Sequence, residues 1–343
     1  MTLESQIKQR ALQSGFDAVG ITDAASVDSE QAGRISAWLD AGFAAQMRYM
    51  HRNLEKRLDP SKLLKNAKSV IVVALNYKPK NPKRKHAPVG RVADYTLYKP
   101  VGCDPPHYSN GYVANYALYE DYHRFIKQRL QKLAQFIASV AGEDVRFKIC
   151  VDSAPLAERT LAVRAGLGFI AKNHILTIPQ LGQEVFLAEI LTTLKLKPDK
   201  PATGRCFDCS KCIEACPTGA LRPDGRLDAN KCISYLTIEH KGEIPPDLAA
   251  AIADRIFGCD RCVEACPIQK EAPACANKEF KFYPDRAMMD LKQIQTMTEE
   301  EFQNQFGDSP IKRLGLERLK RNAEICTKSQ PIGNKPKAPK GQA

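Results

Sequence analysis

The densest group of chemically capable side chains is a run of four cysteines followed by proline, at residues 206–217, CFDCSKCIEACP. The spacing C-x2-C-x2-C-x3-C-P is the one by which bacterial ferredoxins hold a [4Fe-4S] cluster, because short gaps aim successive thiolates at different corners of a cubane. Zinc is the main alternative, but it favours separated C-x2-C pairs and four ligands in all. Consecutive two-residue gaps therefore indicate an iron–sulfur cluster, which soft thiolates suit.

A second, incomplete copy of this pattern follows at residues 258–268, GCDRCVEACPI. It lacks one cysteine, which Cys232 in the segment NKCISYL can supply. In two-cluster ferredoxins the cysteine before the proline binds the other cluster. This crossing predicts two complete ligand sets: Cys206, Cys209, Cys212 and Cys266 for the first cluster, and Cys216, Cys232, Cys259 and Cys262 for the second. Two clusters form an electron relay, so another part of the chain must receive the electrons.

The remaining cysteines have no ligand spacing and are expected to be structural: Cys103, Cys150, Cys275 and Cys326. Cys150 ends the apolar run RFKICV and is expected in the core. The N-terminus shows no apolar signal sequence, and no run approaches the ~20 apolar residues of a membrane span. We therefore expect a cytoplasmic protein without a membrane partner, in which thiols stay reduced.

Composition limits the class of protein without deciding the function. The chain has 343 residues, of which 43% are hydrophobic, enough for two domains or for one domain with an inserted module. Its net charge of +12 suits a polyanion such as nucleic acid, and it suits solubility alone equally well. A Pro- and Lys-rich loop at residues 78–91 has two interpretations, a solvated loop or an arm that contacts phosphates, and we favour the arm.

Hydrophobic periodicity predicts an α/β or α+β domain over residues 1–200. The expected strands are residues 16–22, 67–77, 145–152 and 184–196, and the expected helices are residues 1–16, 29–43, 119–142 and 155–168. Residues 201–280 form the cluster module. Residues 281–326 form a C-terminal helical segment, with a helix at 299–307 and a shorter one near 316–325. Residues 327–343 are expected to be a disordered basic tail.

The stretch VDSAPLAERTLAVRAGLGFIAKNH, residues 151–174, should hold the chemistry. Asp152 follows a predicted strand, where active sites of α/β domains collect, and cations and amides follow it. Asp152 could be a proton donor, or Asp152 or Ser153 could merely cap the next helix. The embedded GLGFIA matches a dinucleotide fingerprint, but a helix precedes it where a strand is required. Gly166 is therefore expected to be a left-handed helix C-cap.

These motifs together resemble epoxyqueuosine reductase, the cobalamin-dependent iron–sulfur enzyme that completes the queuosine base in tRNA. The resemblance rests on residues 151–173, 206–221, 231–245 and 256–267, and it extends over about residues 1–325. The segment YALYEDYHRFIK also resembles the family's YA-x-G-x-DYH motif, with Tyr119 at the glycine position.

The resemblance implies a nitroreductase-like domain that binds cobalamin, reduced by the two clusters, and epoxyqueuosine at the wobble position of tRNA as substrate. By motif, Asp152 corresponds to the proton donor to the epoxide oxygen, and that carboxyl needs a raised pKa to stay protonated near neutral pH. The resemblance also implies a set of cobalamin contacts: Arg159, Lys172 and Asn173, with Asp121, Tyr122 and His123 lining the same pocket. An external low-potential electron donor and a monomeric state complete the expectation.

The chain departs from the family pattern at three further points. CPIQK stands where the family has Trp and Asn after the second Cys-Pro, Ala171 replaces the glycine of GKN, and no appended helical-repeat domain is evident. Three alternatives remain: a reductive dehalogenase-like corrinoid enzyme for a small molecule, a ferredoxin-type electron carrier, and an RNA-binding protein with structural clusters. The dehalogenases carry a twin-arginine export signal that is missing here, and the large N-terminal domain does not suit a simple carrier.

Overall fold

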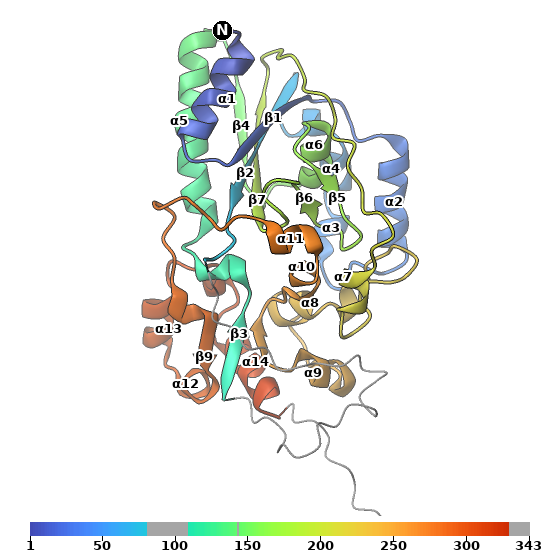
Figure 1. The fold of residues 1–343 in the computed structure, drawn as a ribbon, viewed down its shortest axis with the longest axis vertical. Helices are drawn as coiled ribbons and strands as arrows, with labels where there is room; N and C mark the ends of the chain where they lie inside the picture. Colours follow the sequence, from blue (N-terminus) through green and yellow to red (C-terminus); the bar gives the residue numbers. More distant parts are fainter. Residues whose placement is uncertain (81–108, 143, 329–343) are drawn as a thin grey trace, which may run out of the picture.

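The computed structural model describes residues 1–80, 109–142 and 144–328 (Figure 1). Its upper half is built around a four-stranded sheet in the order β1-β2-β7-β4. The strands are β1 (Ala18–Asp23), β2 (Ser69–Asn76), β7 (Val185–Thr192) and β4 (Phe147–Cys150). All four predicted strands are confirmed within a few residues at each end. Every neighbouring pair is antiparallel, so the sheet is of the α+β kind.

Both faces of this sheet are covered by helices, which explains why β2 is buried along its whole length and apolar from Val70 to Leu75. Ile71, Val73 and Leu75 belong to the core beneath α1 (Leu3–Gln13) and α5 (Tyr122–Ala141). The alternate β2 residues, from Val70 to Ala74, pack on the opposite face beneath α6 (Glu158–Arg164). Side chains of a strand point alternately to its two faces, so a strand covered on both sides must be apolar throughout.

The ends of α5 and α6 follow from local capping. The α5 helix begins at Tyr122, later than the predicted residue 119, because the Asp121 side chain accepts the His123 N–H as its N-cap. It ends at Gly142, as predicted. After α6, Gly166 has a φ of +80°, and β5 (Phe169–Ile170) follows it. The expected left-handed cap is confirmed, and a strand follows where a dinucleotide fingerprint requires a helix.

The remaining described helices and strands are short: α2 (Ser29–Asp40), α3 (Arg48–His51), α4 (Leu54–Leu58), β6 (Leu176–Thr177), α7 (Lys211–Glu214), α8 (Ile233–Ile238), α9 (Pro246–Ile252), α10 (Arg261–Glu264), α11 (Pro267–Glu271) and α12 (Leu291–Thr296). The predicted helix at 29–43 corresponds to α2, which ends before Gly42 at a φ of +72°. Among the described residues no helix is long and apolar enough to span a bilayer.

A second sheet, in the order β8-β3-β9, joins distant parts of the chain. The central strand β3 (Asn110–Val113) pairs in parallel with β8 (Arg255–Phe257) and antiparallel with β9 (Met288–Asp290). These strands come from the three segments predicted as separate units, at residues 1–200, 201–280 and 281–326. Those segments therefore share a sheet, and their boundaries stay a prediction.

The C-terminal helices differ from expectation in length. The helix α13 (Glu299–Phe306) is present and opens with a capping box between Thr298 and Glu301. The prediction of a shorter helix near residues 316–325 is wrong, because α14 (Leu316–Lys328) has 13 residues against 8 in α13. Most of the predicted tail lies outside the described residues.

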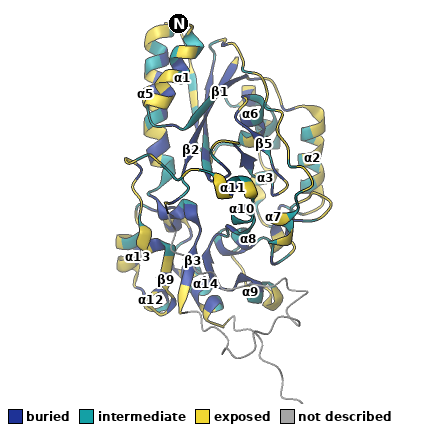
Figure 2. Cartoon of the chain, in the orientation of Figure 1, coloured by how far each residue is buried: buried dark blue, intermediate teal, exposed yellow. Residues whose placement is uncertain are grey.

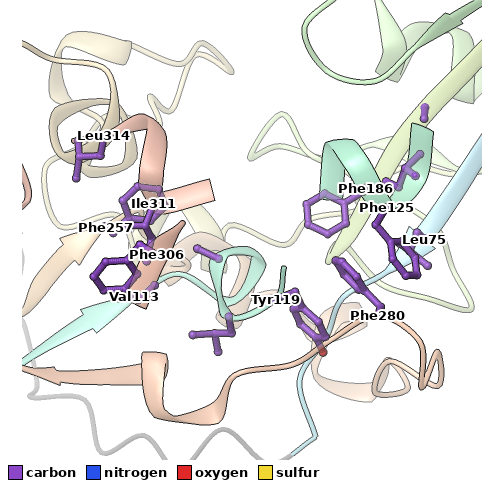
Figure 3. Packing of buried hydrophobic residues seen from close by; sticks show 14 of the residues in the cluster. Leu75, Val113, Tyr119, Phe125, Phe186, Phe257, Phe280, Phe306, Ile311 and Leu314 are labelled. Atoms are coloured by element: carbon purple, nitrogen blue, oxygen red, sulfur yellow. The ribbon is translucent and has the colours of Figure 1, made fainter. Parts of the chain in front are cut away.

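One continuous core connects the two halves of the molecule (Figure 2). Phe280 packs against Phe125 and stacks on Tyr119, with ring centroids 4.6 Å apart in each pair. Figure 3 shows this group beside Phe186 and Leu75 of the upper sheet. Tyr119, the departure from the family's glycine, is thus a buried core residue. Cys150 and Cys326 are buried as predicted, Cys275 is partly buried, and Cys103 lies outside the described residues.

Candidate active site and cluster cysteines

Asp152 lies in the turn between β4 and α6, in a left-handed backbone conformation with a φ of +56°. Its N–H donates a hydrogen bond to Glu158 Oε1 at 3.0 Å. The α6 helix begins at Glu158, and its N-cap position is Ala157, which makes no side-chain cap. The alternative that Asp152 or Ser153 merely caps this helix is therefore excluded. A strained backbone held by a neighbouring side chain is a common feature of active sites.

Two residues from the start of α5 hold the Asp152 carboxylate. The Tyr122 hydroxyl donates to Asp152 Oδ2 at 2.9 Å, and His123 Nε2 lies 3.2 Å from the same oxygen. The Asp152 side chain is still 54% exposed, so one side of the carboxyl faces outward. The predicted pocket residues Tyr122 and His123 thus contact the predicted acid directly.

His123 is in turn held by Asp121 and by Arg313, a residue that the sequence analysis did not identify. His123 Nδ1 lies 2.9 Å from Asp121 Oδ1, and Arg313 Nη1 lies 2.9 Å from His123 Nε2. Arginine can only donate, so its contact suits a neutral ring, whereas the Asp152 contact suits a protonated ring or a protonated carboxyl. The two contacts compete for Nε2, which makes this nitrogen a place where a proton is gained and lost.

Electrostatics favours a proton on the imidazole. Burial opposes the charge on His123, but the hydrogen bonds to Asp121 and Asp152 raise the pKa of His123 above its usual value. The hydrogen bond from His123 lowers the pKa of Asp152, and Tyr122 and Arg313 add to this effect. The expected rise in the Asp152 pKa is therefore wrong for this structure, because the carboxylate has hydrogen-bond donors and cations around it. These opposite shifts favour a proton on His123 over one on Asp152.

Lys172 and Asn173, which the resemblance assigns to cobalamin, donate hydrogen bonds to the loops that carry the cysteines. Lys172 Nζ donates to the carbonyls of Phe207 and Cys209, both at 3.0 Å. Asn173 Nδ2 donates to Gln183 at 2.8 Å and to the Cys262 carbonyl at 3.4 Å. Ala171, the departure from GKN, needs no left-handed backbone.

Arg159 donates to the His174 carbonyl. His174 itself has a left-handed backbone, with a φ of +61°. Arg159 thus fixes the turn that presents Lys172 and Asn173 to the cluster loops.

Seven of the eight candidate ligands gather in two groups, and the place of Cys266 in the first set stays a prediction. Cys206 and Cys209 lie within electrostatic range of Cys212. The thiols within range of Cys262 are those of Cys259, Cys232 and Cys216. Among the described residues, no three His, Cys, Asp or Glu side chains are arranged to hold a single metal ion.

The two groups differ in depth. Phe207, between two cysteines of the first group, is 75% exposed, whereas Cys232 and Cys259 of the second pack against the main core. The first group is therefore nearer the surface.

One short segment, residues 112–123, joins the second cysteine group to Asp152. Asp260, between Cys259 and Cys262, accepts hydrogen bonds from the Asn115 N–H and the Tyr112 hydroxyl, each at 2.7 Å. At its other end this segment supplies Tyr122 and His123. The acid and the buried cysteine group are therefore fixed to the same piece of backbone.

The surroundings of Asp152 also fit a corrinoid. Tyr122 stacks on Phe186 at 4.1 Å, and Tyr77 packs on Phe186 at 4.5 Å, so an aromatic wall extends from the acid. Buried polar atoms without hydrogen-bond partners among the described residues include Arg57 Nε and His174 Nε2. A flat macrocycle edged with carboxamides offers an apolar face to such a wall and donors and acceptors to such atoms.

The chain also matches proteins of known type. The family model "Epoxyqueuosine reductase QueG, DUF1730" matches residues 57–153, and the "4Fe-4S double cluster binding domain" model matches residues 205–269. The epoxyqueuosine reductase of Leadbetterella byssophila is 38% identical, with 92% of this chain and 96% of that protein covered. The chain belongs to the epoxyqueuosine reductase family. The Escherichia coli member is 35% identical over 97% of this chain and 82% of that protein.

Solved structures of the family have the same fold. An epoxyqueuosine reductase bound to an epoxyqueuosine-modified tRNA-Tyr stem loop superposes with a TM-score of 0.82, at 32% identity, covering 94% of this chain and 80% of that one. The Bacillus subtilis enzyme, with its catalytic aspartate loop swung out of the active site, gives a TM-score of 0.80 at 31% identity, with the same coverage.

Proposed function

We propose that this chain reduces epoxyqueuosine at the wobble position of tRNA to queuosine, with a cobalamin and two [4Fe-4S] clusters. The observation that carries the proposal is the segment 112–123, which is bonded to Asp152 at one end and to Asp260 between the second-cluster cysteines at the other. Family membership supports the substrate, since a relative at 32% identity is solved with an epoxyqueuosine-modified tRNA stem loop.

The parts have matching chemical tasks. Converting an epoxide to an alkene and water takes two electrons and two protons. Cobalamin, when bound, supplies low-potential electrons to the substrate carbon. An alkoxide leaves poorly unless an acid protonates it, and Asp152 is the group placed to do so, with His123 refilling its proton. Asp121 and Arg313 keep the His123 ring oriented for this transfer.

Electrons enter through the more exposed cysteine group in this scheme. The first cluster takes Cys206, Cys209, Cys212 and Cys266, and the second takes Cys216, Cys232, Cys259 and Cys262. With both clusters bound, the two cysteine groups would provide the route for electrons from an external low-potential donor to the site that Tyr122 and Tyr77 line. Lys172 and Asn173 hold the two cysteine loops against the catalytic domain, and Arg159 supports them.

Several finer points belong to the same proposal. The domain of residues 1–200 is nitroreductase-like, the cluster module covers residues 201–280, and the chain works as a monomer in the cytoplasm, where its tRNA is. The two-sided sheet supports the first point and the cluster-model match at residues 205–269 supports the second. The basic loop at residues 78–91 lies mostly outside the described residues. Lys78 is described, and its Nζ donates to the carbonyls of Gln269 and Lys270, not outward.

An anaerobic assay tests this function directly. The cluster-loaded protein is incubated with epoxyqueuosine-containing tRNA, cobalamin and a strong reductant, and the nucleosides are analysed by mass spectrometry. Queuosine should form, and omission of cobalamin should prevent it. Absence of queuosine with both clusters and the corrinoid bound would overturn the proposal.

A further inference from the structure

Behind Asp152 lies a pair of buried glutamates that take no part in its contacts with His123. Glu189 is on β7 and pairs directly with Cys150 on β4, two residues before Asp152. Directly paired residues point to the same face of a sheet, and the face that holds Cys150 is the one covered by α6. Glu158 is the first residue of α6. The two carboxyls therefore approach each other between the strand and the helix.

Glu189 has the environment of a protonated acid. It is 0% exposed, and neither carboxyl oxygen has a hydrogen-bond partner among the described residues. Burial, followed by the charges of Glu158 and Asp152, raises the pKa of Glu189 well above its usual value. A buried carboxylate without a donor or a cation is strongly unfavourable, whereas a protonated carboxyl needs only an acceptor for its O–H.

Glu158 is the carboxyl whose charge acts most strongly on Glu189, and in the described structure no direct hydrogen bond joins the two side chains. Burial, followed by the Asp152 charge, raises the pKa of Glu158 to about 7, against the effect of the Asp152 N–H. The other titratable or charged groups around the pair are Arg57 from α4, Arg159 from α6, Cys150 from β4 and Tyr49 from α3. The two arginines face Glu158, so negative charge is better tolerated there than on Glu189. Two coupled carboxyls of this kind hold one proton between them.

We propose that Glu158 and Glu189 share a proton that refills Asp152 for the second protonation of the substrate oxygen. This rests on the proposed function, because that reaction fixes the number of protons. The epoxide loses both C–O bonds, a C=C bond forms, two electrons arrive from the clusters through the corrinoid, and the oxygen leaves as water. Both protons end on the same oxygen, next to Asp152, which carries only one at a time.

The site then stores both protons before the substrate closes it. One is on His123, on the side of Asp152 toward Arg313, and the other is shared by the glutamates on the inner side. Glu158 Oε1 accepts the Asp152 N–H at 3.0 Å, so the Glu158 carboxyl lies beside the turn that carries Asp152, and a bridging water would pass the proton between the two carboxyls.

A simpler role for Glu158 is to hold the left-handed turn of Asp152 in place. Glu158→Gln separates the two roles, because its amide oxygen still accepts the Asp152 N–H but the side chain carries no acid proton. Glu189→Gln likewise keeps size and neutrality and removes the acid. Glu324→Gln, at an exposed residue of α14 paired with Lys328, is the matched control.

Infrared spectroscopy tests the shared proton without any substrate. The wild-type, cluster-loaded protein should show a protonated carboxylic-acid band that persists at neutral pH and disappears only at higher pH, because burial raises the pKa of Glu189 well above its usual value. Glu189→Gln should lack the band and Glu324→Gln should keep it. If Glu189→Gln retains the full band, no shared proton exists and the inference is wrong.

The pH dependence of turnover tests its use. Turnover requires a proton on His123 and a proton on the glutamate pair. At pH values above the pKa of both groups, the logarithm of the wild-type rate should therefore fall with pH at a slope of two. Glu158→Gln and Glu189→Gln should be slower by roughly 10²-fold, with a slope of one and unchanged tRNA affinity. Rates within twofold of wild type with the same slope would show that Glu158 only positions Asp152. If the wild-type protein forms no queuosine, the proposed function is wrong. The infrared test of the shared proton needs no substrate and does not depend on that outcome.

Discussion

The imidazole of His123 and the carboxylate of Asp152 are 3.2 Å apart, between nitrogen Nε2 and oxygen Oδ2. The two residues come from different elements, the first turn of α5 and the loop after β4. In the proposed mechanism, this contact lets a carboxyl whose pKa is lowered serve as a proton donor. The imidazole, whose pKa is raised, would hold the proton and pass it to Asp152 when an alkoxide takes the proton of the acid.

Asp152→Asn should abolish turnover while leaving binding intact. The amide keeps the shape and can still accept from Tyr122, but it cannot donate an acid proton to an alkoxide. We expect a loss of roughly 10²-fold or more in the rate of queuosine formation, the range for a general acid. Cobalamin and tRNA binding, followed by absorbance and by gel shift, should match wild type. Full activity in this variant would remove Asp152 from the mechanism, and Asp247→Asn is the control for an unrelated carboxylate.

His123→Gln should change the pH dependence as well as the rate. A raised His123 pKa means that the proton is present at low pH and is lost as the pH rises through that pKa. Wild-type activity should therefore fall on the alkaline side. Glutamine keeps a hydrogen bond to Asp152 but carries no titratable proton. The variant should therefore be slow, and the alkaline fall of its logarithmic rate with pH should have a slope smaller by one than that of the wild type. An unchanged slope would mean that His123 only orients the acid.

The fold could be predicted from sequence where the pattern is local. The run at residues 67–77 is apolar from Val70 to Leu75 because β2 is covered on both faces, and this pattern alone predicts a buried strand. The length of α14 was misjudged because its buried residues, such as Leu316, Leu319 and Ala323, are separated by charged ones. The β8-β3-β9 sheet was missed since its short strands are far apart in sequence, and only tertiary pairing makes them strands.

The same distinction between local sequence patterns and tertiary contacts applies to the residues of the candidate site. Asp152 and the cysteines are visible because their spacing is local and chemical. Arg313 comes from a C-terminal 3-10 turn without any motif, so only the fold brings it to Asp121 and His123. Glu189 did leave a signal, namely a single acid in the apolar run VFLAEIL of residues 185–191, which a buried strand does not explain. Glu158 was hidden within the helix sequence that identified the family.

The crossed ligand sets predict iron contents for cysteine variants. The anaerobic protein should contain about eight irons per chain, from two cubanes. Cys266→Ala should lose the first cluster and keep the signal of the second in electron paramagnetic resonance, although Cys266 lies in the second motif. Cys216→Ala should do the reverse. Cys275→Ser, with no place in either set, should keep all the iron, and about four irons in the wild type would contradict the assignment.

Gln269 lies in CPIQK, the segment where the family has Trp and Asn after the second Cys-Pro. We expect its hydrogen bonds to stabilise the second cysteine loop in their place. Gln269 is 4% exposed, its Oε1 accepts the Gln183 N–H at 2.6 Å, and its Nε2 donates to the buried Glu184 carboxylate. Gln269→Ala removes the acceptor of the Gln183 N–H and one of the donors to Glu184, which costs roughly 1–3 kcal/mol in the free energy of unfolding. Gln269→Asn is one methylene shorter and should recover only part of this.

The loss should appear as a lower apparent melting temperature of the cluster-loaded protein, compared anaerobically at one heating rate because unfolding with cluster loss is irreversible. Gln303→Ala on the exposed side of α13 is the control, since alanine favours a helix and no buried group loses a partner there. A melting temperature of Gln269→Ala equal to that of the control would show that the second cysteine loop does not depend on this network. A lower value with normal iron content would place the effect in the packing of the loop and not in the cluster.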